Sequence, residues 1–521
     1  MMRPTTSDNS RTISRNTFWY AFDTSWASIV MLIASVPVAR VMGPDVLGKY
    51  VYLLFVTNVA QRLGNVGIPA TSCKYIAEYL GRGELGLARE IFRVTLRQQA
   101  LIAAAITLGG LLLVQLFTEP DLKLVAFLIV SSMLPAMINN IPAQANVAAE
   151  DMRANVPANL TYCVANSLLV ISSLVFHWGL TGLAAATLVS RTMEAVVRYV
   201  GVRRWMRTFP PTTISRDLRT RMFTFSRQNL VLLALGLIVW DRSELLVLKY
   251  FSGVQQIAFY SLAFSIVNQL QMVPRAFAAS VGMTIFAQYG RDRTALARVT
   301  DNATRYVSLI AVPMFLGLSV VAGPLIHLAY GSKYLAVIPV VWVLSLFSIP
   351  RAFQIHLEHL LQAMEHQTFL VKWLVLSGVA NVLLDVLLIP QHGAFGAAIA
   401  NGIAQTLAVG GLWFKAKSVA QIQLPLRFLR RLAVCGAAIL LVVPVEALLP
   451  PAAALVVQVL LGALAFAVAV RATKCLEPED LARFTRLANH LPPSLRDRFA
   501  RGLRLVIAGE SPTAASVPLT L

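Results

Sequence analysis

Residues 43–50 read GPDVLGKY, and a related segment, GVQQIAFY, occupies residues 253–260, 210 positions later. A second segment, GLTGLAAA at 179–186, returns as GAFGAAIA at 393–400, 214 positions later. Both members of the second pair read Gly-x-x-Gly-x-Ala-x-Ala, a spacing of small residues that lets membrane helices approach closely. Nearly equal offsets at two separate places indicate that the chain contains an internal duplication.

The composition indicates that this protein lies in a lipid bilayer. Of 521 residues, 57% are hydrophobic and only 13% are charged, whereas soluble proteins carry about 25% charged residues. Apolar stretches of about 20 residues predict transmembrane helices. We therefore expect an all-α polytopic membrane protein with about fourteen spans: 17–39, 46–66, 93–117, 124–146, 156–178, 180–202, 224–249, 254–276, 304–328, 334–362, 369–389, 394–414, 428–448 and 451–471.

The duplication and the charges organise these spans. A repeat of six spans preserves orientation, so we expect two parallel six-helix lobes followed by a C-terminal helix pair. The net charge of +20 indicates positive-inside loops and anionic membrane lipids rather than nucleic acid. Arginines are concentrated in every second connection between spans. This pattern predicts that the protein lies in the cytoplasmic (inner) membrane with both termini in the cytoplasm. The predicted parts are an N-terminal tail 1–16, an N-terminal lobe 17–203, a basic linker 204–223, a C-terminal lobe 224–417, extra helices 418–471, and a tail 472–521 that is either amphipathic on the membrane or solvated.

Two short stretches, MVPRAF at 272–277 and SIPRAF at 348–353, place a proline and an arginine inside apolar runs. Proline bends a membrane helix, and an arginine at a helix centre costs roughly 2.5–3.5 kcal/mol. Corresponding prolines, Pro69 and Pro135, occur in the first half without an arginine. We assign the prolines to architecture and Arg275 and Arg351 to an anionic ligand. The alternative is that both arginines snorkel to the membrane surface.

Further charged residues lie inside predicted spans. The candidate anion-binding residues, beyond the two Pro-Arg positions, are Arg40, Arg191 and Arg242. The candidate residues for coupling to a proton or Na⁺ are Asp23, Asp241, Glu358 and Asp385. Structural alternatives remain open: Glu194 can pair with Arg198 on its own helix, and Asp241 can neutralise Arg242. Glu358 and Arg351, seven residues apart, are expected to share one helix face.

Catalytic patterns are missing from the sequence. There is no phosphate-binding loop with Gly-Lys-Ser/Thr, and His356 and His359 have no second cluster of metal ligands. The predicted external loops are short, whereas a glycan polymerase usually needs a sizeable one. We therefore expect no enzyme activity, no metal and no cofactor beyond a coupling ion.

Several motifs resemble a known family in order along residues 14–415. They are NTFW at 16–19, ARVMGP at 39–44, GKY at 48–50, GIP at 67–69, DR at 241–242, FYSLA at 259–263, GSKY at 331–334, and LIP at 388–390 through GAAIA at 396–400. The set resembles oligosaccharide flippases of the polysaccharide-export type, in the multidrug/oligosaccharidyl-lipid/polysaccharide (MOP) exporter superfamily. The resemblance implies two lobes around a central cavity and alternating access.

The resemblance also implies a substrate, a polyprenyl-diphosphate-linked oligosaccharide carried from the inner to the outer leaflet for cell-surface or exported polysaccharide. Its implied partners are a glycan polymerase and other assembly proteins. Three alternatives remain: a cation-coupled multidrug exporter of the same fold, a membrane glycan polymerase or ligase, and a noncatalytic scaffold. A drug exporter would need an acidic cavity, whereas the cavity candidates here are mostly arginines.

Overall fold

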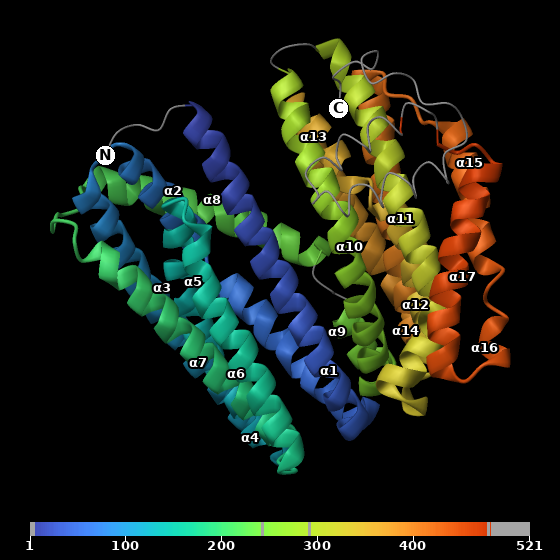
Figure 1. The fold of residues 1–521 in the computed structure, drawn as a ribbon. Coiled ribbons are helices and arrows are strands. Elements are labelled where there is room, and N and C mark those ends of the chain that lie inside the picture. Colours follow the sequence, from blue (N-terminus) through green and yellow to red (C-terminus); the bar gives the residue numbers. More distant parts are fainter. Residues whose placement is uncertain (1–5, 241–243, 290–292, 477–479, 481–521) are drawn as a thin grey trace. The chain divides into compact units, whose positions relative to one another are not determined.

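The computed structural model describes residues 6–240, 244–289 and 293–476, and Asp480. These residues are organised as helices and turns without strands (Figure 1). The helices are α1 (Thr6–Gly64), α2 (Ile68–Gly81), α3 (Leu85–Phe117), α4 (Pro120–Ser131), α5 (Met133–Ala148), η1 (Met152–Asn155), α6 (Val156–Val175), α7 (Gly179–Met206), α8 (Arg216–Trp240), α9 (Glu244–Phe251), α10 (Val254–Tyr289), α11 (Arg293–Tyr330), η2 (Ser332–Tyr334), α12 (Val337–Arg351), α13 (Gln354–Ala363), α14 (Gln367–Ala420), α15 (Leu426–Leu440), α16 (Val445–Leu448) and α17 (Pro451–Ala472).

The chain divides into two compact units, Met1–Ala258 and Phe259–Leu521, called unit 1 and unit 2 below. The division falls inside α10, so α8 and α9 belong to unit 1, whereas the C-terminal lobe is predicted from the sequence to begin at residue 224. The contacts of α8 explain the difference. Its Leu218 and Met222 join a buried cluster with Ile76 of α2, and Ser226 donates a 2.6 Å hydrogen bond to the carbonyl of Val66.

Nine helical stretches within the described residues are long and apolar enough to cross a membrane: 85–117, 120–148, 152–175, 179–206, 296–330, 337–363, 367–420, 426–448 and 451–472. The protein is an all-α polytopic membrane protein, as predicted. The α14 stretch contains two helices, since Gly393 interrupts it, and α1 is interrupted in the same way at Gly43. These two breaks coincide with predicted connections between spans.

The glycines that open the repeated segments share an unusual backbone conformation. Gly43 and Gly253 have φ of 75° and 90°, and Gly179 and Gly393 have φ of 58° and 55°. Residues with a Cβ rarely adopt positive φ, so glycine is required at these turns. Equivalent positions of the duplication therefore make equivalent turns, which is an independent structural sign of the repeat.

The predicted proline kinks recur as helix breaks in both units. Ser132 separates α4 from α5 near Pro135, and a turn at Ala352 and Phe353 separates α12 from α13 just after Pro350. The predicted span 334–362 is found at Val337–Ala363, and the predicted bend is a turn that divides the span into two helices. Pro350 lacks an N–H, and the chain tightens beyond it: Ala352 N–H bonds the carbonyls of Ser348 and Ile349 at 3.1 and 3.2 Å.

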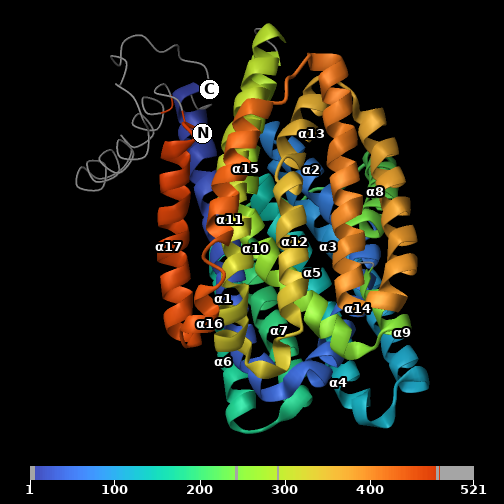
Figure 2. The same ribbon diagram turned by 90° about the vertical axis from the view of Figure 1, so that its right-hand side faces the viewer.

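The last two long helices, α15 and α17, run beside α11 (Figures 1 and 2). A buried cluster joins the three helices, and Gly436 of α15 lies so close to α11 that a Cβ there would come within 2.6 Å of Leu316. Within a membrane such close packing replaces the hydrophobic effect as the source of helix association. The cluster consists of Val312, Phe428, Leu432, Cys435, Val470, Cys475 and Leu476.

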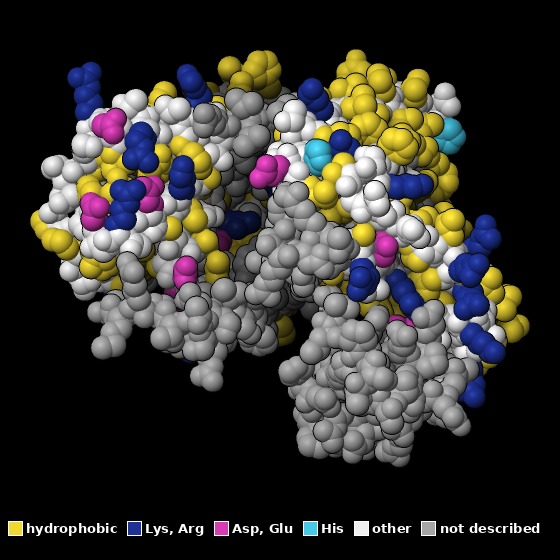
Figure 3. All heavy atoms as spheres, turned by 90° about the horizontal axis from the view of Figure 1, so that it is seen from above, with side chains coloured by type: hydrophobic (Ala, Val, Ile, Leu, Met, Phe, Trp, Pro, Cys, Tyr) yellow, Lys and Arg dark blue, Asp and Glu magenta, His cyan; other side chains and the backbone are white. Residues whose placement is uncertain are grey.

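Basic side chains lie exposed at the connection between α7 and α8, namely Arg203, Arg204, Arg207, Arg216, Arg219 and Arg221. The view from above shows lysine and arginine side chains exposed on that face, among fewer carboxylates (Figure 3). The predicted amphipathic pattern after residue 480 lies outside the described residues.

Candidate functional site

The predicted site residues fall into three groups. Asp241 and Arg242 lie outside the described residues, and Asp23 lies in α1 but its side chain is outside what the structure describes. Arg40 is exposed on α1. The remaining five lie on helices of one unit or the other: Arg191, Arg275, Arg351, Glu358 and Asp385. All of these except Arg275 lie on stretches long and apolar enough to cross a membrane.

Arg351, the last residue of α12, lines a pocket within unit 2 that is built by α10, α12 and α14. Its Cζ lies 6.0 Å from the centroid of the Phe264 ring of α10, within range of a cation–π interaction. The pocket has about 260 Å³ of empty space including its open mouth, and its enclosed part has room for about one water molecule. The pocket therefore combines a positive charge with an aromatic wall.

Amide side chains that were not predicted from the sequence complete the pocket. Asn268 comes from α10, and Asn401 and Gln405 come from α14, four residues apart on one face. Gln405 Nε2 donates a 2.7 Å hydrogen bond to Asn401 Oδ1, which orients both amides. Amides both donate and accept hydrogen bonds, a property suited to hydroxyl-rich or phosphorylated ligands. The signal available in the sequence was the occurrence of paired amides inside an apolar span.

Gly402 allows the pocket to close on one side. A Cβ on Gly402 would lie 2.1 Å from the Phe347 ring, which therefore packs directly against the α14 backbone.

Arg275 and Glu358 form a second charged group in unit 2. Arg275 lies half-buried in α10, which continues as a helix through Pro274. Its charge interacts with that of Glu358 from α13, and Glu358 Oε1 accepts a 2.8 Å hydrogen bond from Gln354 Nε2. The expected shared helix face of Arg351 and Glu358 is not found, because the turn between α12 and α13 separates them.

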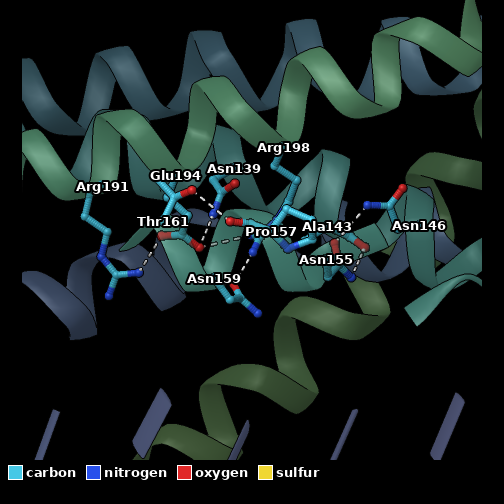
Figure 4. Close-up of polar contacts among 10 residues, drawn as sticks. All are labelled: Asn139, Ala143, Asn146, Asn155, Pro157, Asn159, Thr161, Arg191, Glu194 and Arg198. Carbon is cyan, nitrogen blue, oxygen red and sulfur yellow. Dashed lines mark hydrogen bonds and ion pairs between the residues drawn. The ribbon is translucent and has the colours of Figure 1, made fainter. Parts of the chain in front are cut away.

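A charged cluster in unit 1 joins α5, α6 and α7 (Figure 4). Glu194 Oε2 accepts a hydrogen bond from Arg191 Nη1 at 3.1 Å, and Glu194 Oε1 forms an ion pair with Arg198 Nη1 at 3.1 Å. Asn139 Nδ2 donates to the same Oε1 at 2.8 Å, and Arg198 Nη2 donates to Asn159 Oδ1. The predicted Glu194–Arg198 pair is confirmed, and the asparagines from neighbouring helices are partners that helical periodicity did not reveal.

Arg191 occupies a distinct position within this cluster. Its Cζ lies 4.2 Å from the Tyr162 ring centroid, and its side chain is 35% exposed, against 5% for Glu194 and 5% for Arg198. One turn earlier, Thr187 bonds the hydroxyl of Tyr50 of α1 at 2.8 Å. Arg191 thus lies where α1, α6 and α7 meet, held on one side by a carboxylate and on another by an aromatic ring.

Asp385 of α14 is fully buried, and Asn381 Nδ2 donates to its Oδ2 at 3.3 Å. A buried ionisable residue in a membrane helix is a candidate for ion coupling. Over the part of the chain that the structure describes, there is no group of three or more His, Cys, Asp or Glu side chains that could hold a metal.

The profile of a family described as "Polysaccharide biosynthesis protein" matches residues 36–339, more than half of the chain. The chain belongs to this family. The chain is also similar to the probable low-salt glycan biosynthesis flippase Agl15 of Haloferax volcanii, 22% identical over 35% of this chain and 39% of that protein. The succinoglycan biosynthesis transport protein ExoT of Rhizobium meliloti is 22% identical over 66% of this chain and 67% of that protein.

Several of these matches are partial. The chain spans about two fifths of the length of Agl15 and of the uncharacterized membrane protein MJ1068 of Methanocaldococcus jannaschii, which is 24% identical over 220 residues.

Solved structures share the fold of this family member. The lipid II flippase MurJ in an inward closed conformation superposes with a TM-score of 0.71 at 13% identity, covering 86% of this chain and 97% of that one. An inward-facing multidrug resistance MATE transporter of the MOP superfamily superposes with a TM-score of 0.61 at 18% identity, and the match covers 76% of this chain and 95% of that one. The predicted membership of the polysaccharide-export family is confirmed, and the chain shares its fold with a solved transporter of the MOP superfamily.

Proposed function

We propose that this protein is a flippase that carries a polyprenyl-diphosphate-linked oligosaccharide from the inner to the outer leaflet of the cytoplasmic membrane. The observation that carries the proposal is Arg351, a guanidinium between membrane-spanning helices in a pocket walled by Phe264 and by amides. A guanidinium matches a phosphate group through paired, charge-assisted hydrogen bonds. Membership of the polysaccharide biosynthesis family supports a glycan as the rest of the substrate.

Different parts of the substrate bind different places in and around the pocket. Its enclosed volume accepts one phosphoryl oxygen beside Arg351, and the amides of Asn268, Asn401 and Gln405 bind the neighbouring phosphate and sugar oxygens at the mouth. Arg275 supplies a second positive charge on α10, moderated by Glu358. The prenyl chain stays in lipid, and alternating access of the two lobes exposes the substrate to each leaflet in turn.

Export is driven, in this proposal, by a proton or Na⁺ gradient acting through Asp385, whose carboxylate is buried beside Asn381. Asp23, Asp241 and Glu358 are the other candidates. The protein acts without covalent chemistry, with both termini in the cytoplasm, and hands its substrate to a glycan polymerase and other assembly proteins. Anionic lipids meet the exposed arginines at the cytoplasmic ends of the helices.

The test replaces Arg275 and Arg351 by Ala, singly and together, and measures export of lipid-linked glycan from cells or into proteoliposomes. Each charge-assisted contact contributes about 1.5–3 kcal/mol, so we expect each single variant to lose about tenfold or more and the double variant to lose export. Normal export by well-expressed double variants would exclude the proposal. In the same assay, Asp385→Asn should abolish the dependence of export on the ion gradient, and unchanged dependence would exclude Asp385 from coupling.

The multidrug exporter of the same fold is the second candidate, favoured by the structural similarity to MATE transporters. Susceptibility of cells to cationic drugs separates the two, because deletion of a drug exporter raises susceptibility and leaves glycan export intact.

A further inference from the structure

The residues directly after α17 fold back onto unit 2. They form a Schellman turn, in which Lys474 has φ of 50° and the N–H of Cys475 bonds the carbonyl of Val470 at 3.1 Å. Cys475 and Leu476 are then buried in one cluster with residues of α11, α15 and α17. Arg431 of α15 donates a 2.8 Å hydrogen bond to the carbonyl of Lys474. This segment is therefore held in place, whereas residues beyond a last helix usually fray.

Asp480 gives the segment a charged anchor. Its side chain is only 1% exposed, and its carboxylate accepts hydrogen bonds from Arg305 Nη2 at 2.6 Å and from the Tyr306 hydroxyl at 2.9 Å. A carboxylate is costly to bury unless charged and hydrogen-bonding groups receive it. The Arg305 guanidinium is supported in turn by the Phe428 ring of α15, whose centroid lies 4.9 Å from its Cζ. Two consecutive residues of α11 thus hold Asp480.

Tyr306 connects this anchor to α10. Its ring meets that of Phe277 edge-to-face, with centroids 6.5 Å apart and an interplanar angle of 76°. Phe277 is the last residue of the stretch MVPRAF, which carries Arg275. Pro274 cannot donate a backbone hydrogen bond, so the direction of α10 after it depends more on tertiary contacts than in an ordinary helix. The Tyr306 ring is one such contact, and its hydroxyl bonds Asp480.

We propose that residues 473–476 and Asp480 form a latch on unit 2, and that Asp480 is a positioning residue for Arg275. Asp480 fixes Tyr306, and Tyr306 in turn fixes the part of α10 that follows Pro274. The role of Arg275 toward the substrate rests on the proposed function, whereas the latch does not.

The experiment follows the latch and α10 separately in the purified full-length protein. Trypsin cleavage after Lys474 reports opening of the latch, because Arg431 binds the carbonyl of the scissile bond and Cys475 is buried. Hydrogen–deuterium exchange of the peptide 272–280 reports the local stability of α10. Size-exclusion chromatography selects the folded fraction of each variant.

Four variants separate the contacts. Asp480→Ala removes the anchor, and Tyr306→Phe removes only the hydroxyl that bonds it. Phe277→Leu removes the ring contact and leaves the anchor intact. Arg298→Gln is the matched control, because Arg298 is an exposed arginine on the same helix as Arg305.

The expected results differ between the two measurements. Asp480→Ala should accelerate trypsin cleavage about tenfold or more, because hydrogen bonds to a charged group are lost, and it should also accelerate exchange in α10. Phe277→Leu should accelerate that exchange about two- to tenfold, the effect of losing an aromatic pair, and leave cleavage unchanged. Tyr306→Phe should give a smaller increase in both. Arg298→Gln should match the parent in both.

Two results would overturn the proposal. One is parent-like cleavage in folded Asp480→Ala, which would remove the latch. The other is faster cleavage without a change of exchange in α10, which would leave an attachment of the chain and no positioning of Arg275. If Asp480→Ala does not fold, Tyr306→Phe decides in the same way, since it keeps its ring beside Phe277.

Export separates this inference from the proposed function. Asp480→Ala should reduce export of lipid-linked glycan about as much as Arg275→Ala. Faster exchange in α10 of Asp480→Ala, together with normal export by Arg275→Ala, would keep the latch and remove the proposed role of Arg275. Normal export by Asp480→Ala beside impaired export by Arg275→Ala would instead contradict the positioning of Arg275 by the latch.

Discussion

Arg191 in unit 1 and Arg351 in unit 2 are both arginines in membrane-spanning helices, but their surroundings differ in kind. Arg191 is held by the carboxylate of Glu194, which is itself paired with buried Arg198. Arg351 lies over an aromatic ring and beside the amides of a narrow pocket. A carboxylate fixes a guanidinium in one geometry, whereas amides and an aromatic face support it and can rearrange around a ligand. We infer that the Arg191 guanidinium in unit 1 is held rigidly and that the surroundings of Arg351 in unit 2 are more adaptable.

The two units also treat buried carboxylates differently. Glu194 has two arginines around it, so its charge is compensated within the fold. Asp385 is fully buried with an amide, Asn381, as a hydrogen-bond donor. A carboxylate with arginine partners is a structural anion, and one with an amide partner is suited to exchange a proton or to meet a small cation. This difference is the reason for proposing that the coupling ion acts through Asp385 in unit 2.

The largest effect is expected from Glu194→Ala, which removes the carboxylate that holds Arg191 and Arg198 in unit 1. Loss of the carboxylate removes the 3.1 Å ion pair of the buried Arg198, and breaking a buried ion pair costs about 3–5 kcal/mol. The thermal unfolding midpoint of the purified protein should fall steeply. Glu358→Ala in unit 2 is the control, because Glu358 is only partly buried and should cost clearly less; equal losses would contradict the assignment of rigidity to unit 1.

A smaller effect is expected from Gly402→Ala, which alters the wall of the Arg351 pocket in unit 2. The new Cβ meets the Phe347 ring at 2.1 Å and must push it into the pocket, which costs about 1–3 kcal/mol. Export should fall with the unfolding midpoint. Gly410→Ala on the same helix meets nothing within 4 Å and should leave both unchanged or raise stability by up to about 1 kcal/mol. Matching behaviour of the two variants would show that Phe347 does not shape the pocket.

The smallest effect tests what the units have in common. Gly43→Ala and Gly393→Ala, one in each unit, place a Cβ at φ of 75° and 55°, which costs about 1–2 kcal/mol each. The repeat predicts similar losses in thermal stability for both. Gly109→Ala in α3, where a Cβ meets nothing within 4 Å, is the control; a loss confined to one unit would weaken the structural equivalence of the repeats.

Much of the architecture was predictable from local signals. Runs of apolar residues are long because the bilayer is about 30 Å thick, and this physical requirement appears directly in the sequence. The offset between repeated segments predicted equivalent turns, and all four glycines concerned have positive φ. The sequence predicted only a bend at Pro350, whereas the helix ends there and a new one begins. A proline indicates where a backbone hydrogen bond is lost but not which conformation the following residues adopt.

The candidate sites were predictable only in part. A charge inside an apolar run is visible as an anomaly, so Arg191, Arg275, Arg351 and Asp385 could be named. Their partners could not, since Asn139, Asn159 and Tyr162 meet Arg191 and its cluster only after three helices pack. The amides around Arg351 are likewise separated by more than a hundred residues, with Asn268 on one helix and Asn401 on another.

The sequence alone therefore determined the membrane environment, the helical spans, the duplication and the family, because each depends on composition or on spacing along one chain. Only the tertiary structure decided which arginines pair with a carboxylate and which one lies in a pocket. Those properties depend on distances of a few ångströms between side chains of different helices, and no pattern along a single helix encodes them.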